Sequence, residues 1–288
     1  MAQTRQLKTR IKAVKSTRQI TKAMELVAAS KMRRAQETAM KSRDYRDLAR
    51  QILTKISELT DVSKHPLYKQ RVVKTRLIIA ITSDRGLAGA YNSNVLRQLT
   101  SELQADRLAN VHSQVIVVGK QGSKFVVRLK NVEILAAYDE FPENPTANDI
   151  RPILNTITDL YINKKVDAVD TLYTNYKSSI SQIVQIQRIL PAVFGTSQIS
   201  SDLDDALFEP SVQEVLDSVT IRLVEAQLNQ TFFEAQASEH SMRMLAMKSA
   251  TDNANDLIDD LTLAFNSARQ ASITQELAEI TGGAEAIK

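Results

Sequence analysis

Cysteine is absent from this chain of 288 residues. Disulfide frameworks, cysteine-based zinc sites, thiol nucleophiles and iron–sulfur clusters are therefore excluded. The three histidines, His65, His112 and His240, lie far apart and show no metal-ligand spacing, so we expect no metal site. Uninterrupted apolar runs of 18 residues are also missing, which excludes a hydrophobic transmembrane helix. We accordingly expect a soluble chain that holds no metal or cofactor.

Glycine and proline are scarce, with seven and six residues. So few turn residues argue against a β-sandwich or barrel and against a disordered chain. Residues 1–65 and 211–281 contain neither type, whereas every proline falls within 66–210. Proline destabilises a helix interior by about 3 kcal/mol and glycine by about 1 kcal/mol. We therefore predict a long helix in 1–65, an inserted domain in 66–210, and a long helix in 211–288 that ends at Gly282–Gly283.

Apolar residues recur every 3.5 residues through the C-terminal segment. Counting from Val212 to Ala268 in alternating steps of four and three, fourteen of seventeen positions are apolar. A period held for this long is typical of a coiled-coil seam. Seventy helical residues span about 105 Å, so we expect this helix to protrude from any compact domain.

The N-terminal segment predicts a helix with a less regular apolar stripe. Leu7, Ile11 and Val14 begin the stripe, and small residues such as Ala28, Ala35 and Ala39 fill its middle. After a slip in phase, the stripe is expected to continue through Ile20, Met24, Val27, Leu48, Ile52, Ile56 and Leu59.

The two long segments carry opposite charge. Residues 1–50 have a net charge of +10 and residues 211–288 a net charge of −7. We predict that the two helices pair along their apolar seams, with the charge favouring this pairing. Two solvated helix faces of unrelated charge are the alternative.

The inserted segment alternates between strand-like and helix-like patterns. Short β-branched runs predict strands at 75–82, 113–119, 132–135, 168–173 and 182–189, the last on a sheet edge because it alternates. Helical patterns lie at 92–104, 122–129 and 149–163. Strands that alternate with helices predict a doubly wound, Rossmann-like α/β domain.

A domain of this class invites a search for a nucleotide site after its first strand. The segment SDRGLAGAYN (residues 83–92) occupies that place, but it contains neither GxGxxG nor GxxxxGK[ST]. The segment GKQGSK (residues 119–124) lacks the Ser or Thr that would follow the lysine. Ordinary strand-to-helix turns explain both segments, so no catalytic residue is predicted and the chain is expected not to be an enzyme.

A basic coiled-coil protein that binds nucleic acid is the alternative function. The basic N-terminal helix supports it, whereas the scarcity of aromatic side chains for base stacking argues against it, since Tyr45 is the only one among the first 60 residues.

Three stretches carry a family resemblance. They are RIKAVKSTRQITKAMELVAASKMRRAQ (residues 10–36), SDRGLAGAYN, and MKSATDNANDLI followed by ARQASITQELAEITGGAEA (within residues 247–286). Together they resemble the gamma subunits of F-type ATP synthases over essentially the whole chain. Since the match begins within the first dozen residues and the cysteine-bearing insert of plastid members is missing, the resemblance indicates a bacterial member without a transit peptide.

The resemblance implies a fold and a function. The terminal helices would form an antiparallel coiled coil inside the hexamer of alpha and beta subunits. The inserted domain would sit on the membrane c ring beside the epsilon subunit, at the cytoplasmic face of the bacterial plasma membrane. As a central-stalk rotor, such a chain couples c-ring rotation to ATP synthesis or hydrolysis by the beta subunits, as a non-catalytic subunit that binds no nucleic acid.

The resemblance also implies roles for single residues. Arg269 and Gln270 match a pair that contacts the beta subunit, and Thr274 and Glu276 are neighbouring signature positions. The basic side chains expected to face beta are Lys22, Lys31, Arg33 and Arg34. Phe208 and Glu209 resemble a segment that approaches the c ring, and Met24 matches a helix-packing methionine.

Overall fold

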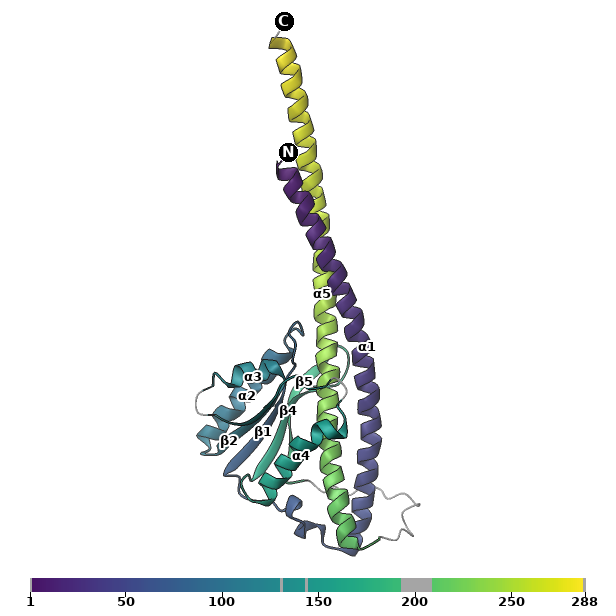
Figure 1. The fold of residues 1–288 in the computed structure, drawn as a ribbon, viewed down its shortest axis with the longest axis vertical. Coiled ribbons are helices and arrows are strands. Elements are labelled where there is room, and N and C mark those ends of the chain that lie inside the picture. Colours follow the sequence, from purple (N-terminus) through teal and green to yellow (C-terminus); the bar gives the residue numbers. More distant parts are fainter. Residues whose placement is uncertain (1, 130–131, 143–144, 193–208, 287–288) are drawn as a thin grey trace. The chain divides into compact units, whose positions relative to one another are not determined.

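The computed structural model describes residues 2–129, 132–142, 145–192 and 209–286 (Figure 1). Helix α1 runs from Ala2 to Leu59 and helix α5 from Val212 to Ala286. Between them the elements are β1 (Thr75–Ile81), α2 (Tyr91–Leu108), β2 (His112–Val118), α3 (Lys120–Val126), β3 (Glu133–Tyr138), α4 (Ala147–Ile162), β4 (Ala168–Tyr176) and β5 (Gln182–Leu190). Two short 3-10 helices, Val62–Lys64 and Pro66–Tyr68, follow α1. The chain divides into two compact units, Met1–Ala28 with Arg243–Lys288 and Ala29–Met242.

The larger unit contains a five-stranded sheet in the order β3-β2-β1-β4-β5. β1 to β4 are parallel, and β5 is antiparallel to β4 at one edge. Helices α2 and α3 cover one face, whereas α4 and α5 cover the other (Figure 1). The predicted α/β class, with long helices and a Rossmann-like inserted sheet, is therefore confirmed.

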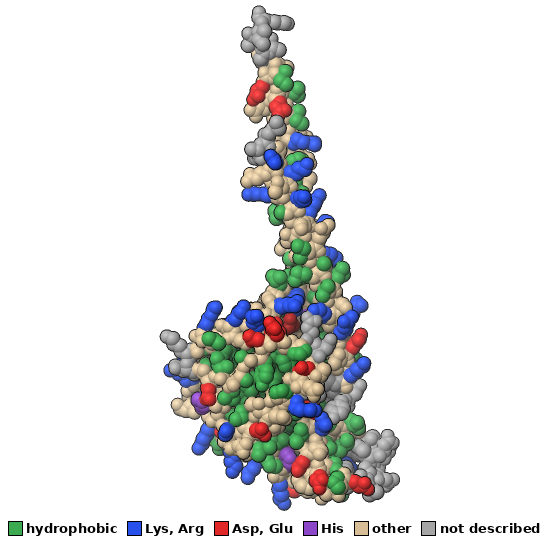
Figure 2. Space-filling view, in the orientation of Figure 1, with side chains coloured by type: hydrophobic (Ala, Val, Ile, Leu, Met, Phe, Trp, Pro, Cys, Tyr) green, Lys and Arg blue, Asp and Glu red, His purple; other side chains and the backbone are tan. Residues whose placement is uncertain are grey.

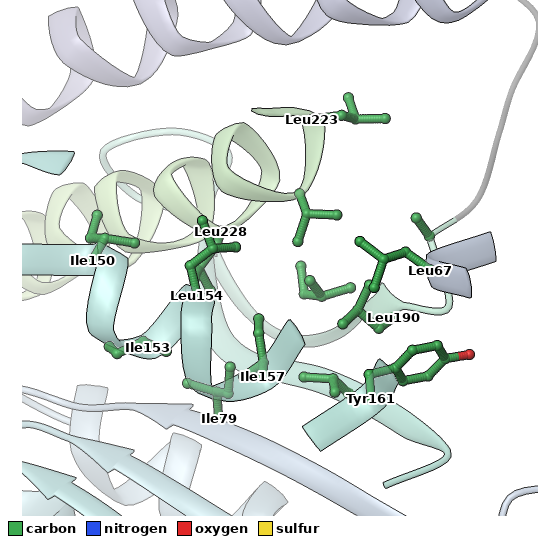
Figure 3. Packing of buried hydrophobic residues seen from close by; sticks show 14 of the residues in the cluster. Leu67, Ile79, Ile150, Ile153, Leu154, Ile157, Tyr161, Leu190, Leu223 and Leu228 are labelled. Carbon is green, nitrogen blue, oxygen red and sulfur yellow. The ribbon is translucent and has the colours of Figure 1, made fainter. Parts of the chain in front are cut away.

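Both faces of the sheet are buried, which explains the unbroken apolar strands. Leu77, Ile79 and Ile81 of β1 face the α4–α5 side, whereas Ile78 and Ala80 face the α2–α3 side. Figure 3 shows the first of these cores, where α4 and α5 meet the sheet. Residues of α4 spaced by three or four line this core, namely Ile150, Ile153, Leu154, Ile157 and Tyr161. The inserted sheet is thereby bound to the α5 segment of its own unit.

The apolar repeat predicted for α5 is confirmed. Every one of the seventeen positions from Val212 to Ala268 is buried or half-buried. The predicted end of this helix at Gly282–Gly283 is wrong, because α5 continues to Ala286. Glycine disfavours a helix by only about 1 kcal/mol per residue, and the continuing backbone hydrogen bonds outweigh that amount near a helix end.

The predicted slip in the α1 stripe is wrong at four of its seven positions, whereas Met24, Ile52 and Ile56 are half-buried or buried as expected. Ile20 and Val27 are 58% and 54% exposed, and Leu48 and Leu59 are also exposed. On each side of residues 42–47, the described positions of the stripe follow the same 3.5-residue phase through polar and small side chains. Its buried or half-buried members include Leu7, Ile11, Val14, Arg18, Thr21, Ala28, Met32, Ala35, Ala39, Ala49, Leu53 and Ile56. Hydrophobicity alone missed this phase because Arg18 and Thr21 occupy two of its positions.

Polar contacts join α1 and α5 within the smaller unit. Thr251 Oγ1 donates to Thr21 Oγ1 over 2.8 Å, and both side chains are buried. One helical turn away, Arg18 Nη1 donates to Asn255 Oδ1 over 3.3 Å. Because the residue numbers fall on α1 as they rise on α5, the two helices are antiparallel here.

A charged network crosses the sheet near the amino ends of β1 and β4. Arg76 contacts Glu102 and Asp106 of α2 at 3.0 and 2.9 Å, and Asp170 of β4 at 2.6 Å. Arg188 of β5 also pairs with Asp170, which is only 1% exposed. Burial alone would lower the pKa of the Arg76 guanidinium, but the Asp170 and Asp106 carboxylates outweigh burial and raise it. Arg76 is therefore a permanent cation that neutralises carboxylates from two elements.

A buried histidine holds the segment between α1 and β1. His65 Nδ1 accepts a hydrogen bond from the backbone N–H of Leu67 over 3.2 Å, which caps the 3-10 helix Pro66–Tyr68. His65 Nε2 lies 3.4 Å from Asp217 Oδ1 of α5. Burial lowers the pKa of His65, and the Asp217 carboxylate opposes this shift only in part.

Acidification is expected to destabilise this segment through His65. Because its pKa is lower in the folded state, the unfolded chain binds the proton more readily, and stability falls as the pH drops from about 6.5 through the folded pKa. His65→Asn keeps an acceptor for the cap but does not titrate. Thermal unfolding midpoints measured between about pH 7.5 and pH 6 should therefore fall less in His65→Asn than in the parent chain. Parallel curves for the two proteins would contradict this role.

Candidate partner-binding surface

Beyond the carboxyl ends of β1 and β2, backbone N–H groups are already hydrogen-bonded to the chain's own side chains. Asp84 Oδ1 accepts hydrogen bonds from the backbone N–H groups of Lys120 and Glu140, over 3.0 and 2.9 Å. The N–H of Gly122 donates to Thr82 Oγ1 over 3.0 Å. Backbone N–H groups of this kind bind phosphates in doubly wound nucleotide-binding domains. Here the Asp84 carboxylate already accepts hydrogen bonds from two such N–H groups.

Gly119 allows this close packing. Its φ is +97°, and a Cβ built on it would lie 2.2 Å from the carbonyl oxygen of Thr82. Only glycine fits such a position without a backbone shift. The first glycine of the GKQGSK segment thus allows two strand-to-helix turns to pack against each other.

The basic residues named on α1 lie at its surface. Arg33 and Arg34 are exposed, and Lys31 is half-buried. Lys22 is exposed and lies 3.0 Å from the Glu25 carboxylate on the same helix. Met24 is half-buried beside the α1 seam. Lys22 and Met24 belong to the smaller unit and the other three to the larger unit, so the structure does not join them into one site.

The four residues named on α5 lie together on the smaller unit. Arg269, Gln270, Thr274 and Glu276 are all exposed. Since Thr21 lies opposite Thr251 in an antiparallel pair, Arg269 lies alongside the first residues of α1. Thr274 and Glu276 extend beyond that end, and Ser272 Oγ donates to Glu276 Oε1 over 3.4 Å. This end of α5 therefore presents polar groups from a single helix.

Of the two residues expected to approach the c ring, only Glu209 lies within the described residues. Glu209 is exposed and comes directly before Pro210 and α5, whereas Phe208 lies outside the described residues. Across the described ranges, no three His, Asp or Glu side chains come together as a metal ion would require. No described helix has a segment long and apolar enough to span a bilayer.

Sequence reasoning missed an apolar component of this surface. Large apolar side chains on the smaller unit are exposed, and they are Ile20, Leu26, Val27, Leu257, Leu263, Ile273, Leu277 and Ile280. A pair of helices can bury only one stripe of each helix, so apolar residues one or two positions away from the 3.5-residue seam must be exposed. Those off-seam apolar residues were the sequence signal for this part of the surface. Exposed apolar side chains among polar ones are typical of a surface that contacts another protein.

The chain is similar to known proteins along its whole length. A family model described as ATP synthase matches residues 3–287. The ATP synthase gamma chain of Staphylococcus carnosus (strain TM300) is 38% identical over 293 residues, which covers all of both chains. Two solved structures share the fold. One, from the central stalk and c ring of the Tetrahymena thermophila mitochondrial ATP synthase, has a TM-score of 0.62 at 22% identity and covers 80% of this chain and 99% of that one. The other, from the Euglena gracilis mitochondrial ATP synthase in rotational state 3, has a TM-score of 0.66 at 19% identity and covers 99% and 95%.

Proposed function

This chain belongs to the ATP synthase gamma chain family, and we propose that it is the central-stalk rotor subunit of a proton-driven ATP synthase. The subunit is not itself catalytic, because ATP forms at the beta subunits. Its role is to couple rotation of the membrane c ring to changes in the conformation of beta. The full-length match to a gamma chain at 38% identity is the observation that carries this proposal.

The proposed mechanism is mechanical. The antiparallel α1–α5 pair presents a different surface to each of the three beta subunits. As the pair turns, each beta subunit meets in sequence a face that favours a different conformation, and so a different affinity for nucleotide. Coupling requires only that the faces differ, and they do, since α1 is basic and the last part of α5 is acidic.

Two groups of residues are proposed to contact beta. Arg269 and Gln270 provide a guanidinium and an amide on an exposed helix face, suited to charge-assisted hydrogen bonds with a carboxylate. The second group is the basic side chains Lys22, Lys31, Arg33 and Arg34, and beta is proposed to offer acidic loops to them. Exposed ion pairs contribute only about 0–1 kcal/mol each, which suits a surface that must move past its partner.

The larger unit is proposed to bind the c ring and the epsilon subunit. Glu209, exposed next to the start of α5, and Phe208 are the residues proposed to approach the ring. This arrangement would place the chain as a peripheral subunit at the cytoplasmic face of a bacterial plasma membrane.

Arg269→Ala tests the proposed contact with beta. We expect this change to lower the rates of ATP synthesis and of coupled ATP hydrolysis several-fold in the reconstituted complex, because it removes a charge-assisted hydrogen bond to beta. The unfolding midpoint of the isolated chain should stay unchanged, since Arg269 is exposed. Both rates and the midpoint would be measured on the same preparation.

Arg97→Ala is the matched control, because it removes another exposed arginine, from α2. Equal rates in the parent complex and in both variants would contradict the contact. Failure of the parent chain to assemble with alpha and beta subunits would instead contradict the rotor function itself.

A further inference from the structure

Six basic side chains gather at the amino-terminal edge of the inserted sheet. The register pairs Thr75 with His112, and Arg76 with Ala168, so the segments preceding these strands lie along the same edge. All six side chains are exposed, and they are Lys69, Lys74, Arg107, Arg128, Lys164 and Lys165. Figure 2 shows Lys and Arg side chains along the lower left margin of the globular part, where this edge lies.

The acidic groups at this edge are already engaged. Asp167 Oδ2 accepts hydrogen bonds from the backbone N–H groups of Lys74 and Thr75, each over 3.0 Å. Glu133 lies 2.8 Å from His112 Nε2. None of the six basic side chains lies within ion-pair distance of an acid in the part of the chain that the structure describes. Because the six basic side chains outnumber Asp167 and Glu133, the edge carries an excess of positive charge.

Apolar side chains are interspersed among these charges. Val72 is 82% exposed, Leu108 86%, Val127 75% and Ile162 49%. Leu108 and Ile162 are the last residues of α2 and α4, and Val127 follows α3. Basic residues at helix carboxyl ends also complement the helix dipole. That effect explains the charges but not four large apolar side chains left in water.

We propose that this edge binds the anionic headgroups of a phospholipid bilayer. Clustered Lys and Arg attract an anionic lipid surface, and neighbouring aliphatic side chains enter the region between headgroups and acyl chains. A nucleic acid fits less well, because the described, exposed side chains at this edge include no Phe or Tyr on which bases could stack. The inference goes beyond the rotor function and requires no other subunit.

Vesicle sedimentation with the full-length chain tests the proposal. The chain should bind phosphatidylcholine vesicles that contain about one third phosphatidylglycerol, and not vesicles of phosphatidylcholine alone. The double variant Lys164→Glu, Lys165→Glu should reduce partitioning into these vesicles about tenfold or more, since each Lys near an anionic surface contributes to the attraction. The double variant Leu108→Ser, Val127→Ser should also reduce it, although the net charge is unchanged.

The matched control is Lys8→Glu, Lys12→Glu, which makes the same change in charge on exposed residues of α1. Partitioning should change little in this control, and an equal loss would overturn the proposal in favour of diffuse charge attraction. Loss of binding to a single-stranded RNA in the edge variants, with vesicle binding intact, would overturn it in favour of nucleic acid. If the Lys164 and Lys165 changes prevent folding, judged by circular dichroism, Lys69→Glu with Lys74→Glu provides the same test on another segment.

Discussion

Arg76→Met is expected to lower the free energy of unfolding by about 3–5 kcal/mol. The arginine is 12% exposed at its side chain, and its removal leaves Glu102 and Asp106 without their cation, while Asp170 keeps only Arg188. A buried carboxylate without a partner must remain charged in a poorly hydrated site or take up a proton. Urea denaturation of the full-length chain, followed by circular dichroism, measures the change.

Two further variants decide whether the network causes the loss. Arg97→Met removes an exposed arginine from α2, the helix that carries Glu102 and Asp106, and should change stability by no more than about 0.5 kcal/mol. Arg76→Met combined with Asp106→Asn and Asp170→Asn should recover part of the loss, because the orphaned charges are removed together. No recovery would mean that the lost side-chain packing, and not charge burial, dominates.

Val219→Pro is expected to reduce stability by about 3 kcal/mol or more and to abolish assembly. The residue lies within α5 and packs against the main core of the larger unit. Proline there removes one backbone hydrogen bond and clashes with the carbonyl group one turn earlier, so α5 must kink where the sheet packs on it. Co-purification with tagged alpha and beta subunits, together with urea denaturation, measures both effects.

Val219→Ala separates the helix break from the loss of the side chain. It should lower stability by only about 1 kcal/mol and leave assembly intact. A chain that ends at Thr281 removes Gly282–Lys288, whose first residue is exposed and would meet nothing with an added Cβ. We expect this truncated chain to assemble almost normally. Equal failure of the truncated chain and Val219→Pro would contradict the importance of an unbroken seam.

The sequence predicts much of the fold because its apolar periods are strong. The β-branched runs of β1 and β2 are buried on both faces, so they read as continuous apolar strands, and the 3.5-residue repeat of α5 lies on a real seam. The phase of α1 was not predictable in this way. Its seam includes Arg18 and Thr21, which form hydrogen bonds to the opposite helix that hydrophobicity does not encode.

The charged network around Arg76 and the partner-binding surface show two other limits of prediction from sequence. Arg76, Asp106 and Asp170 are separated by tens of residues, and only the strand order and the position of α2 bring them together. The only local sign of this network in the sequence was a residue of opposite charge inside each of two apolar strands, Arg76 in β1 and Asp170 in β4. The Arg269–Glu276 surface could be named only by resemblance, because exposed polar residues on a helix leave no periodic pattern that distinguishes a contact from a solvated face.

The Thr21–Thr251 hydrogen bond has a consequence for how the helix pair resists shear. Apolar packing along the seam is not directional, so it does not by itself fix one alignment of the two helices. A directional bond between two buried hydroxyl groups is broken by a slide of even one residue. Each hydroxyl also faces a carbonyl group of its own helix, at Arg18 and at Met247, so a slide costs the bond between the helices and leaves the bonds within each helix in place. The threonine pair thus opposes sliding of one helix along the other, so that a force along either helix is transmitted to both without a change in their alignment.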